Sequence, residues 1–165
     1  MTTLSFTVHL PDPAATTALA ERVAAVIRPG DTILLSGPIG AGKSHFARAV
    51  IQTLMARSGR IEDVPSPTYT LVQTYTLPEA EILHSDLYRI TSEDDLQELG
   101  LDEAFGQAIC LVEWAERLGD LTPKDALALT FDIPDAPGRI LRGTAHGGAL
   151  SERWQTVFQS DTAPT

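Results

Sequence analysis

The stretch GPIGAGKS, residues 37–44, decides the fold, because it matches the pattern G-x-x-x-x-G-K-[ST] of a phosphate-binding loop. Glycines in such a loop let backbone N–H groups close around phosphate oxygens, and the helix that follows points its positive end at them. The residues before it, TILLSG at 32–37, predict a central strand, and those after it predict an amphipathic helix. This strand–loop–helix context is the one that the pattern requires.

The loop also carries the side chains that nucleotide phosphates need. Lys43 supplies a full positive charge for the β- and γ-phosphates, and the hydroxyl of Ser44 is the expected ligand of Mg²⁺. A glycine-rich turn with a surface lysine is the alternative, which the flanking strand and helix disfavour. We therefore expect the whole loop to bind nucleotide: Gly37, Pro38, Ile39, Gly40, Ala41, Gly42, Lys43 and Ser44.

The loop alone does not choose between classes of nucleotide-binding protein. Guanine-binding proteins carry [NT]-K-x-D, and the nearest approach here, TPKD at 122–125, has its lysine in the wrong place, so ATP is preferred. A small-molecule kinase usually adds an arginine-rich lid that shields the transferring phosphate from water. The sequence has no such arginine cluster, but a kinase and a nucleotide-binding regulatory module both stay open as alternatives.

Strand and helix patterns alternate along the rest of the chain. Strands are expected at 4–10, 68–77, 81–86 and 108–113, with a late hairpin formed by 126–133 and 138–145. Further helices are expected at 13–27, 91–100 and 151–158. This alternation indicates the α/β class, with a three-layer P-loop NTPase-like fold whose mixed sheet is parallel in its centre and antiparallel at its edges. Residues 1–158 would form a single P-loop domain, and 159–165 a flexible tail.

Composition narrows the possible partners and location. The formal net charge of −10 repels the nucleic-acid backbone and argues against broad independent binding of RNA or DNA. Cys110 is the single cysteine and lies in an apolar run, so we expect a small buried hydrophobe. No stretch approaches the roughly 18 apolar residues that span a bilayer, and the amino terminus lacks a signal-peptide pattern. We therefore expect a cytoplasmic protein without membrane contact.

Four motifs in fixed order resemble those of one family. The loop GPIGAGKS is followed by SPTYTLV at 66–72, HSDLYRI at 84–90 and AICLVEW at 108–114. This set closely resembles the TsaE (YjeE) family, bacterial P-loop ATPases required to form threonylcarbamoyladenosine next to the anticodon of tRNA. One P-loop is common, whereas four ordered motifs are specific. The resemblance covers about residues 30–118.

The resemblance implies a Mg²⁺-dependent ATP hydrolase that is weak alone and binds the complex of TsaD, the transferase, with TsaB. Hydrolysis would support repeated turnover of that complex, with tRNA contacted only indirectly. The sequence departs from the family pattern at Pro38, at Ser44, where threonine is common, and at Ala115, where proline is common. Ser44 keeps the hydroxyl that a metal needs, whereas Pro38 removes a backbone N–H at the mouth of the loop.

Two carboxylates each end an apolar run. Glu113 closes AICLVE, and the resemblance likewise implies that it holds the metal with Ser44; a surface salt bridge or helix cap is the alternative. Asp86 ends EILHSD, and the family treats this aspartate as important for hydrolysis, through the attacking water or a metal-bound water. Strand alternation places His84 on the same side as Asp86, where we expect it to make a structural hydrogen bond.

The remaining candidates are a threonine and several aromatic residues. Thr68 follows two prolines and is placed to act like the threonine of a nucleotide-sensing switch; a hydroxyl bonded to a loop amide is the alternative. Trp114 stays open between core packing and a place in the nucleotide site or partner surface, and Arg89 between a salt bridge and a phosphate or partner contact. Packing roles are expected for Tyr69, Tyr75 and Tyr88. The expected catalytic residues are Lys43, Thr68 and Asp86.

Overall fold

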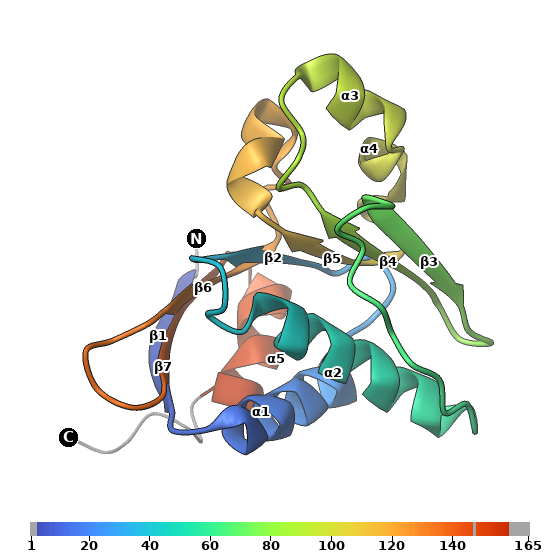
Figure 1. The fold of residues 1–165 in the computed structure, drawn as a ribbon. Coiled ribbons are helices and arrows are strands. Elements are labelled where there is room, and N and C mark those ends of the chain that lie inside the picture. Colours follow the sequence, from blue (N-terminus) through green and yellow to red (C-terminus); the bar gives the residue numbers. More distant parts are fainter. Residues whose placement is uncertain (1–2, 147, 159–165) are drawn as a thin grey trace.

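The computed structural model describes residues 3–146 and 148–158, whose strands form one seven-stranded sheet in the order β1-β7-β6-β2-β5-β4-β3 (Figure 1). The strands are β1 (Thr3–Leu10), β2 (Thr32–Ser36), β3 (Val72–Thr76), β4 (Glu81–Asp86), β5 (Ile109–Glu113), β6 (Leu127–Asp132) and β7 (Arg139–His146). β2 runs parallel to β5 and β6, and β4 runs parallel to β5. The pairs β1–β7, β6–β7 and β3–β4 are antiparallel. The expected mixed sheet, parallel in its centre and antiparallel at its edges, is confirmed.

Helices cover both faces of this sheet (Figure 1). On one face lie α1 (Pro13–Val26), α2 (Lys43–Arg57) and α5 (Gly148–Phe158); on the other lie α3 (Glu93–Glu98), α4 (Leu101–Ala104) and the 3₁₀ helix η1 (Ala115–Leu121). Because successive side chains of a strand point to opposite faces, Ile33 and Leu35 enter the larger core, whereas Leu34 enters the smaller one beneath α3 and η1. The fold is therefore the three-layer α/β arrangement that the sequence predicts.

The two long helices begin where the sequence places them. Asp12 caps α1 by accepting a hydrogen bond from the backbone N–H of Ala15 at 2.8 Å, and Pro13 occupies its first turn. α2 begins at Lys43, directly after the loop. Its expected core face is buried: Ala47, Val50, Ile51 and Leu54. Packing of that face fixes the helix axis, so the amino terminus of α2 stays directed at the concave side of the loop.

One expected element differs in the structure, and one short helix was not expected. The strand predicted over 68–77 begins only at β3, because its first residues form a turn in which Leu71 has φ of 68° and its carbonyl accepts a hydrogen bond from Asp86. The helix predicted over 91–100 is α3, which Ser92 caps and which ends before Gly100 as expected; Gly100, with φ of 73°, then begins α4, a short helix that the sequence did not predict. In the first case, a tertiary hydrogen bond outweighs the strand propensity of the segment.

The carboxyl-terminal helix is tied to the start of the central strand. Arg153 of α5 donates two hydrogen bonds to the carboxylate of Asp31, at 2.6 and 2.8 Å, and a third to the carbonyl of Val26. The ring of Phe158 stacks on Phe6 of β1 with 3.8 Å between centroids. α5 confirms the helix expected over 151–158, while the tail expected at 159–165 lies outside the described residues.

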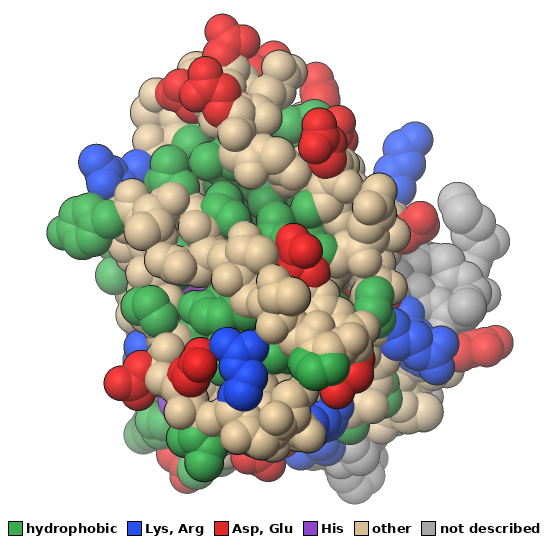
Figure 2. All heavy atoms as spheres, turned by 90° about the vertical axis from the view of Figure 1, so that its right-hand side faces the viewer, with side chains coloured by type: hydrophobic (Ala, Val, Ile, Leu, Met, Phe, Trp, Pro, Cys, Tyr) green, Lys and Arg blue, Asp and Glu red, His purple; other side chains and the backbone are tan. Residues whose placement is uncertain are grey.

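The surface is acidic at one end of the molecule. Acidic side chains gather over α3 and α4, whose first turns contain Glu93, Asp94, Asp95, Asp102 and Glu103 (Figure 2). Within the part of the chain that the structure describes, no helix has the length and apolar character needed to cross a membrane. Cys110 is fully buried as expected, and burial raises the pKa of its thiol to about 11.

Candidate nucleotide site

The glycines of the loop let it turn tightly between β2 and α2. Gly37 has φ of 131°, and a Cβ there would lie 2.3 Å from the carbonyl oxygen of Phe131 in β6, so only glycine fits. Gly40 and Gly42 also have positive φ, of 81° and 117°. The loop therefore forms a concave surface at the carboxyl ends of the central parallel strands, where ligands of open α/β sheets bind.

The Lys43 side chain is folded into this loop. Its ammonium donates hydrogen bonds to the carbonyls of Gly37 and Pro38, the latter at 3.2 Å, and lies 4.2 Å from the ring centroid of Trp114. The residue is only 5% exposed, and burial lowers the pKa of the amine below its ordinary value. Three carboxylates oppose that shift: Glu113, Glu116 and Asp86. Since Pro38 accepts this bond through its carbonyl, the loop keeps that contact although proline lacks an N–H.

Glu113 connects the loop to the neighbouring strands. It ends β5, beside β2, and its Oε1 accepts a hydrogen bond from Ser44 Oγ at 2.5 Å. Its Oε2 pairs at 2.7 Å with Nε2 of His84, which lies on β4. Glu113 is 1% exposed, which excludes a surface salt bridge. The hydrogen bond expected of His84 is present, and it holds the carboxylate in a fixed orientation toward Ser44.

The oxygens of Ser44 and Glu113 fit a Mg²⁺ ion. Octahedral Mg²⁺ binds oxygens at about 2.1 Å, so neighbouring ligands lie about 3 Å apart, and the 2.5 Å between these two oxygens would widen by about half an ångström. The described residues contain no group of three or more His, Cys, Asp or Glu that could hold a metal. A hydroxyl and one carboxylate are nonetheless enough ligands from the protein, because the other ligands of Mg²⁺ are waters and phosphate oxygens.

Asp86 lies next to Glu113 at the carboxyl ends of the parallel strands β4 and β5. The register of β4 and β5 pairs the two residues directly. Asp86 accepts hydrogen bonds from the hydroxyl of Thr68 at 3.4 Å and from the backbone N–H of Tyr88 at 3.0 Å. The Thr68 hydroxyl also lies 2.9 Å from that of Ser66, so its contacts are with side chains and not with the loop amide considered as the alternative. Thr68 and Asp86 together face the loop.

The aromatic residues correct part of the sequence analysis. Trp114 is only partly buried and has φ of 57°, and its ring contacts Lys43 on one side and lies 4.9 Å from the ring of Tyr88. It therefore forms a wall of the site and also packs against the smaller core. Of the tyrosines, Tyr75 packs against the core, and Tyr88, although 45% exposed, packs its ring on Trp114. Tyr69 is 85% exposed, so packing was wrong for this residue. Arg89 lies over the Tyr69 ring, with 5.6 Å from its Cζ to the centroid.

One cavity of about 440 Å³ unites residues that the sequence selects: Lys43, Ser44, Thr68, Asp86, Glu113 and Trp114. A second cavity of about 280 Å³ lies on the other side of the loop, between Gly40 and Gly42 and the turn at 10–13. Arg139 also lines this second cavity and donates a hydrogen bond to the Gly40 carbonyl at 3.3 Å. No sequence pattern singles out this region, because Asp12 and Pro13 there are equally explained as a helix start.

Comparison with known proteins decides the family. The family model described as threonylcarbamoyl adenosine biosynthesis protein TsaE matches residues 10–140. The chain belongs to the TsaE family. The tRNA threonylcarbamoyladenosine biosynthesis protein TsaE of Bacillus subtilis is 36% identical over 151 residues, which cover 91% of this chain and 92% of that protein. The TsaE protein of Rickettsia bellii is 36% identical over 121 residues, or 73% of this chain and 82% of its own length.

A solved structure extends the TsaE comparison to the fold. The crystal structure of Bacillus subtilis YdiB matches with a TM-score of 0.76 and 27% sequence identity, over 98% of this chain and 99% of that one. Membership of the TsaE family, expected from four sequence motifs, is thus confirmed over a longer part of the chain than those motifs cover.

Proposed function

We propose that this chain is a Mg²⁺-dependent ATP hydrolase that binds and energises the TsaB–TsaD complex during formation of threonylcarbamoyladenosine next to the anticodon of tRNA. The observation that carries the hydrolase is the convergence of Lys43, the Ser44–Glu113 pair and Asp86 in one cavity at the phosphate-binding loop. Phosphoryl transfer depends on such charge neutralisation and positioning more than on a strong base. The named pathway of the relatives supports the tRNA-related role.

Each residue has one task in this proposal. Lys43 exchanges its loop carbonyls for the β- and γ-phosphates, because charged phosphate oxygens are the stronger acceptors. Ser44 and Glu113 would hold Mg²⁺, which when bound neutralises developing phosphate charge. Asp86 orients the attacking water. Thr68, already in contact with Asp86, orders its segment when a γ-phosphate is present.

The nucleoside would occupy the second cavity. Asp86 and Thr68 mark the γ-phosphate end of the loop, and the smaller cavity opens on its opposite side. Its lining includes Leu10, Pro11 and Pro13, which present apolar surface to the base. Asp12, Thr16 and Arg139 add polar groups in the same cavity, and we propose that they orient the base and ribose.

The partners explain why hydrolysis would be weak in isolation. The exposed rings of Tyr69 and Tyr88 lie near the γ-phosphate end of the loop. A TsaB–TsaD complex bound there would exclude water and hold Thr68 in one position. A formal net charge of −10 disfavours direct tRNA binding, so contact with tRNA is indirect. We place the protein in the cytoplasm, without membrane contact.

The test is a reconstituted assay with purified components. ATP turnover is followed with and without TsaB and TsaD, alongside threonylcarbamoyladenosine formed on tRNA, with Lys43→Ala as the inactive control. We expect stimulation of hydrolysis by the complex and repeated rounds of modification only with the unaltered chain. The proposal would be refuted if TsaB and TsaD did not change ATP turnover and if the chain did not change the modification of tRNA. Transfer of phosphate to a metabolite would favour a small-molecule kinase, and binding without any turnover a regulatory module.

A further inference from the structure

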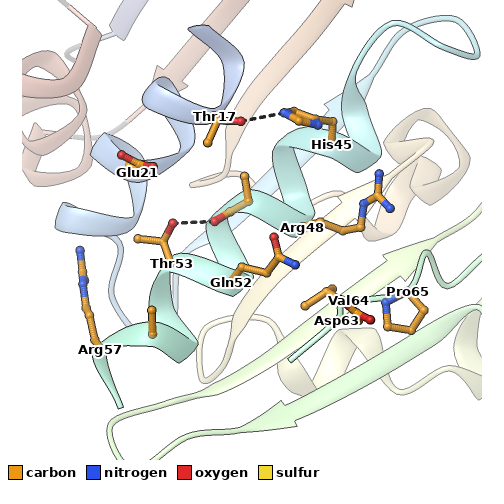
Figure 3. Close-up of a pocket in the computed structure, with 12 residues that line it drawn as sticks. Thr17, Glu21, His45, Arg48, Gln52, Thr53, Arg57, Asp63, Val64 and Pro65 are labelled. Carbon is orange, nitrogen blue, oxygen red and sulfur yellow. Dashed lines mark hydrogen bonds between the residues drawn. The ribbon is translucent and has the colours of Figure 1, made fainter. Parts of the chain in front are cut away.

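Arg48 of α2 forms part of the wall between the nucleotide cavity and a larger groove. The groove, of about 870 Å³, runs along α2 between α1 and residues 63–65 (Figure 3). In Figure 3 the Arg48 side chain extends from α2 on the side away from α1. Arg48 also lines the cavity that contains Lys43 and Asp86. The residue therefore borders the site that we assign to phosphate.

Helix geometry directs this side chain back toward the loop. Arg48 follows Ser44 by four residues, so the two share one face of α2, and side chains on a helix lean toward its amino terminus. The Nε of Arg48 donates a hydrogen bond to the Ser44 carbonyl at 3.3 Å, which confirms this direction. The terminal nitrogens thus lie beyond Nε with no hydrogen bond to any described residue.

The charge of Arg48 is not balanced by a carboxylate. Across residues 3–146 and 148–158, no carboxylate forms an ion pair with it, although the protein carries a net charge of −10. Arg153, by contrast, is paired with Asp31 at 2.6 Å. A partly buried guanidinium without a counterion is costly to desolvate, and an anionic ligand removes that cost.

We propose that Arg48 is a second cation for the γ-phosphate of ATP, complementing Lys43; this assignment rests on the proposed function. Arg48 shares its cavity with Thr68 and Asp86, which mark the γ-phosphate end. It is absent from the lining of the nucleoside cavity, whereas His45 lines both. The planar fork of arginine also matches two oxygens of one phosphate, which lysine cannot do.

The experiment compares two nucleotides that differ by one phosphate. Calorimetric titration with Mg²⁺-ADP and with the Mg²⁺ complex of the non-hydrolysable β,γ-imido analogue of ATP gives dissociation constants for the unaltered chain and for Arg48→Gln. We expect the affinity of Arg48→Gln for the analogue to fall about 10- to 100-fold, the usual effect of a charged hydrogen bond. Its affinity for ADP should change by less than about twofold, within the scatter of an uninvolved site.

Two further variants make the result specific. Arg57→Gln removes an arginine from the same helix and groove that does not line the nucleotide cavity, and should leave both affinities unchanged. Arg48→Lys keeps the charge but removes the fork, and should lose affinity for the analogue selectively, by about tenfold at most. If Arg48→Gln destabilises the fold, selectivity in Arg48→Lys decides the question.

The outcomes separate the two proposals. If a folded Arg48 variant loses affinity for both nucleotides equally, or for neither, the γ-phosphate assignment is overturned, while the proposal of an ATP hydrolase stands. Failure of the unaltered chain to bind either nucleotide refutes the proposed function, and the Arg48 assignment falls with it. Selective loss of the analogue in the Arg48 variants, with Arg57→Gln unchanged, supports it.

Discussion

At the scale of single residues, Lys43 combines burial with hydrogen-bond acceptors that its own loop supplies. Carbonyls of Gly37 and Pro38 hold its ammonium, and the Trp114 ring lies beside it. These contacts keep the charge in place before any phosphate arrives, so little ordering is needed on binding. The cost of that arrangement is desolvation, which lowers the pKa of Lys43.

As the pH rises, nucleotide affinity should therefore begin to fall at a lower pH than it would if Lys43 were exposed. Below the lowered pKa of Lys43 the ammonium is charged and binds phosphate; above it the charge, and with it the affinity, is lost. Calorimetric titration with ADP from neutral pH to about 10.4, the ordinary lysine value, measures this. Lys43→Arg, if it binds, should show no such decline, since arginine stays charged. A flat profile for the unaltered chain would contradict the role of Lys43.

Substituting the two carboxylates one at a time should produce two different defects. Asp86→Asn should keep ATP affinity and lower partner-stimulated hydrolysis by about 100-fold, because it alters the water and not the phosphate contacts. Glu113→Gln should instead weaken the Mg²⁺ dependence of binding, since Glu113 accepts from Ser44 at 2.5 Å. Steady-state turnover and Mg²⁺ titrations of nucleotide binding distinguish them. Lost ATP affinity with normal turnover per bound ATP in Asp86→Asn would exclude its assigned role.

At the scale of elements, the loop depends on its contact with β6. Gly37→Ala would place a Cβ 2.3 Å from the Phe131 carbonyl oxygen, so the loop must move away from the sheet. We expect this variant to lose nucleotide binding and more than about 2 kcal/mol of unfolding free energy. Gly40→Ala is the matched control: its φ of 81° is also unfavourable for alanine, but no heavy atom lies within 4 Å of the added Cβ.

That control should cost about 1 to 2 kcal/mol, the penalty of a left-handed alanine. Urea unfolding and ADP titration of both variants provide the comparison. Equal losses in Gly37→Ala and Gly40→Ala would mean that backbone strain alone, and not the contact with β6, makes glycine necessary in this loop.

Local sequence signals determine most of these elements, and two of the exceptions have a common cause. Caps and apolar periodicity predicted both ends of α1 and the start of α2. The turn before β3 and the start of η1 were not predicted, because Leu71 and Trp114 adopt positive φ without being glycine. Hydrogen bonds from residues that are distant in the sequence hold both segments, including one from the backbone N–H of Leu87 to the carbonyl of Glu113.

The same reasoning applies to the site. Motifs identified the loop, Asp86 and Glu113 as chemical groups, but not their arrangement. The link between His84 and Glu113 exists only because β4 lies beside β5 in a particular register, with Asp86 opposite Glu113. Strand order depends on tertiary packing, which a single sequence does not specify residue by residue.

At the scale of the whole molecule, the ion pair between Asp31 and Arg153 joins α5 to the start of the central strand β2. Asp31 also accepts from the backbone of Arg28 at 2.8 Å, so the pair fixes the turn that enters β2. Because both side chains are largely buried, Arg153→Met should destabilise the protein by about 2 to 4 kcal/mol and leave Asp31 unpaired.

A double-mutant cycle with Asp31→Asn measures the coupling. Urea unfolding of both single variants and the double variant should give an interaction energy of about 1 to 3 kcal/mol. Additive losses would show that α5 is held by its apolar contacts, such as Phe158 on Phe6, and that the ion pair contributes no net stability.

The position of Trp114 also gives the protein an optical reporter of its own. The chain has two tryptophans: Trp154 is fully buried in the core, whereas Trp114 contacts the ammonium that we expect to move to phosphate. A nearby cation changes indole emission, so occupation of the loop should alter the intrinsic fluorescence, with Trp154 as a constant background. Stopped-flow mixing could then time the arrival of nucleotide and its departure without any attached dye.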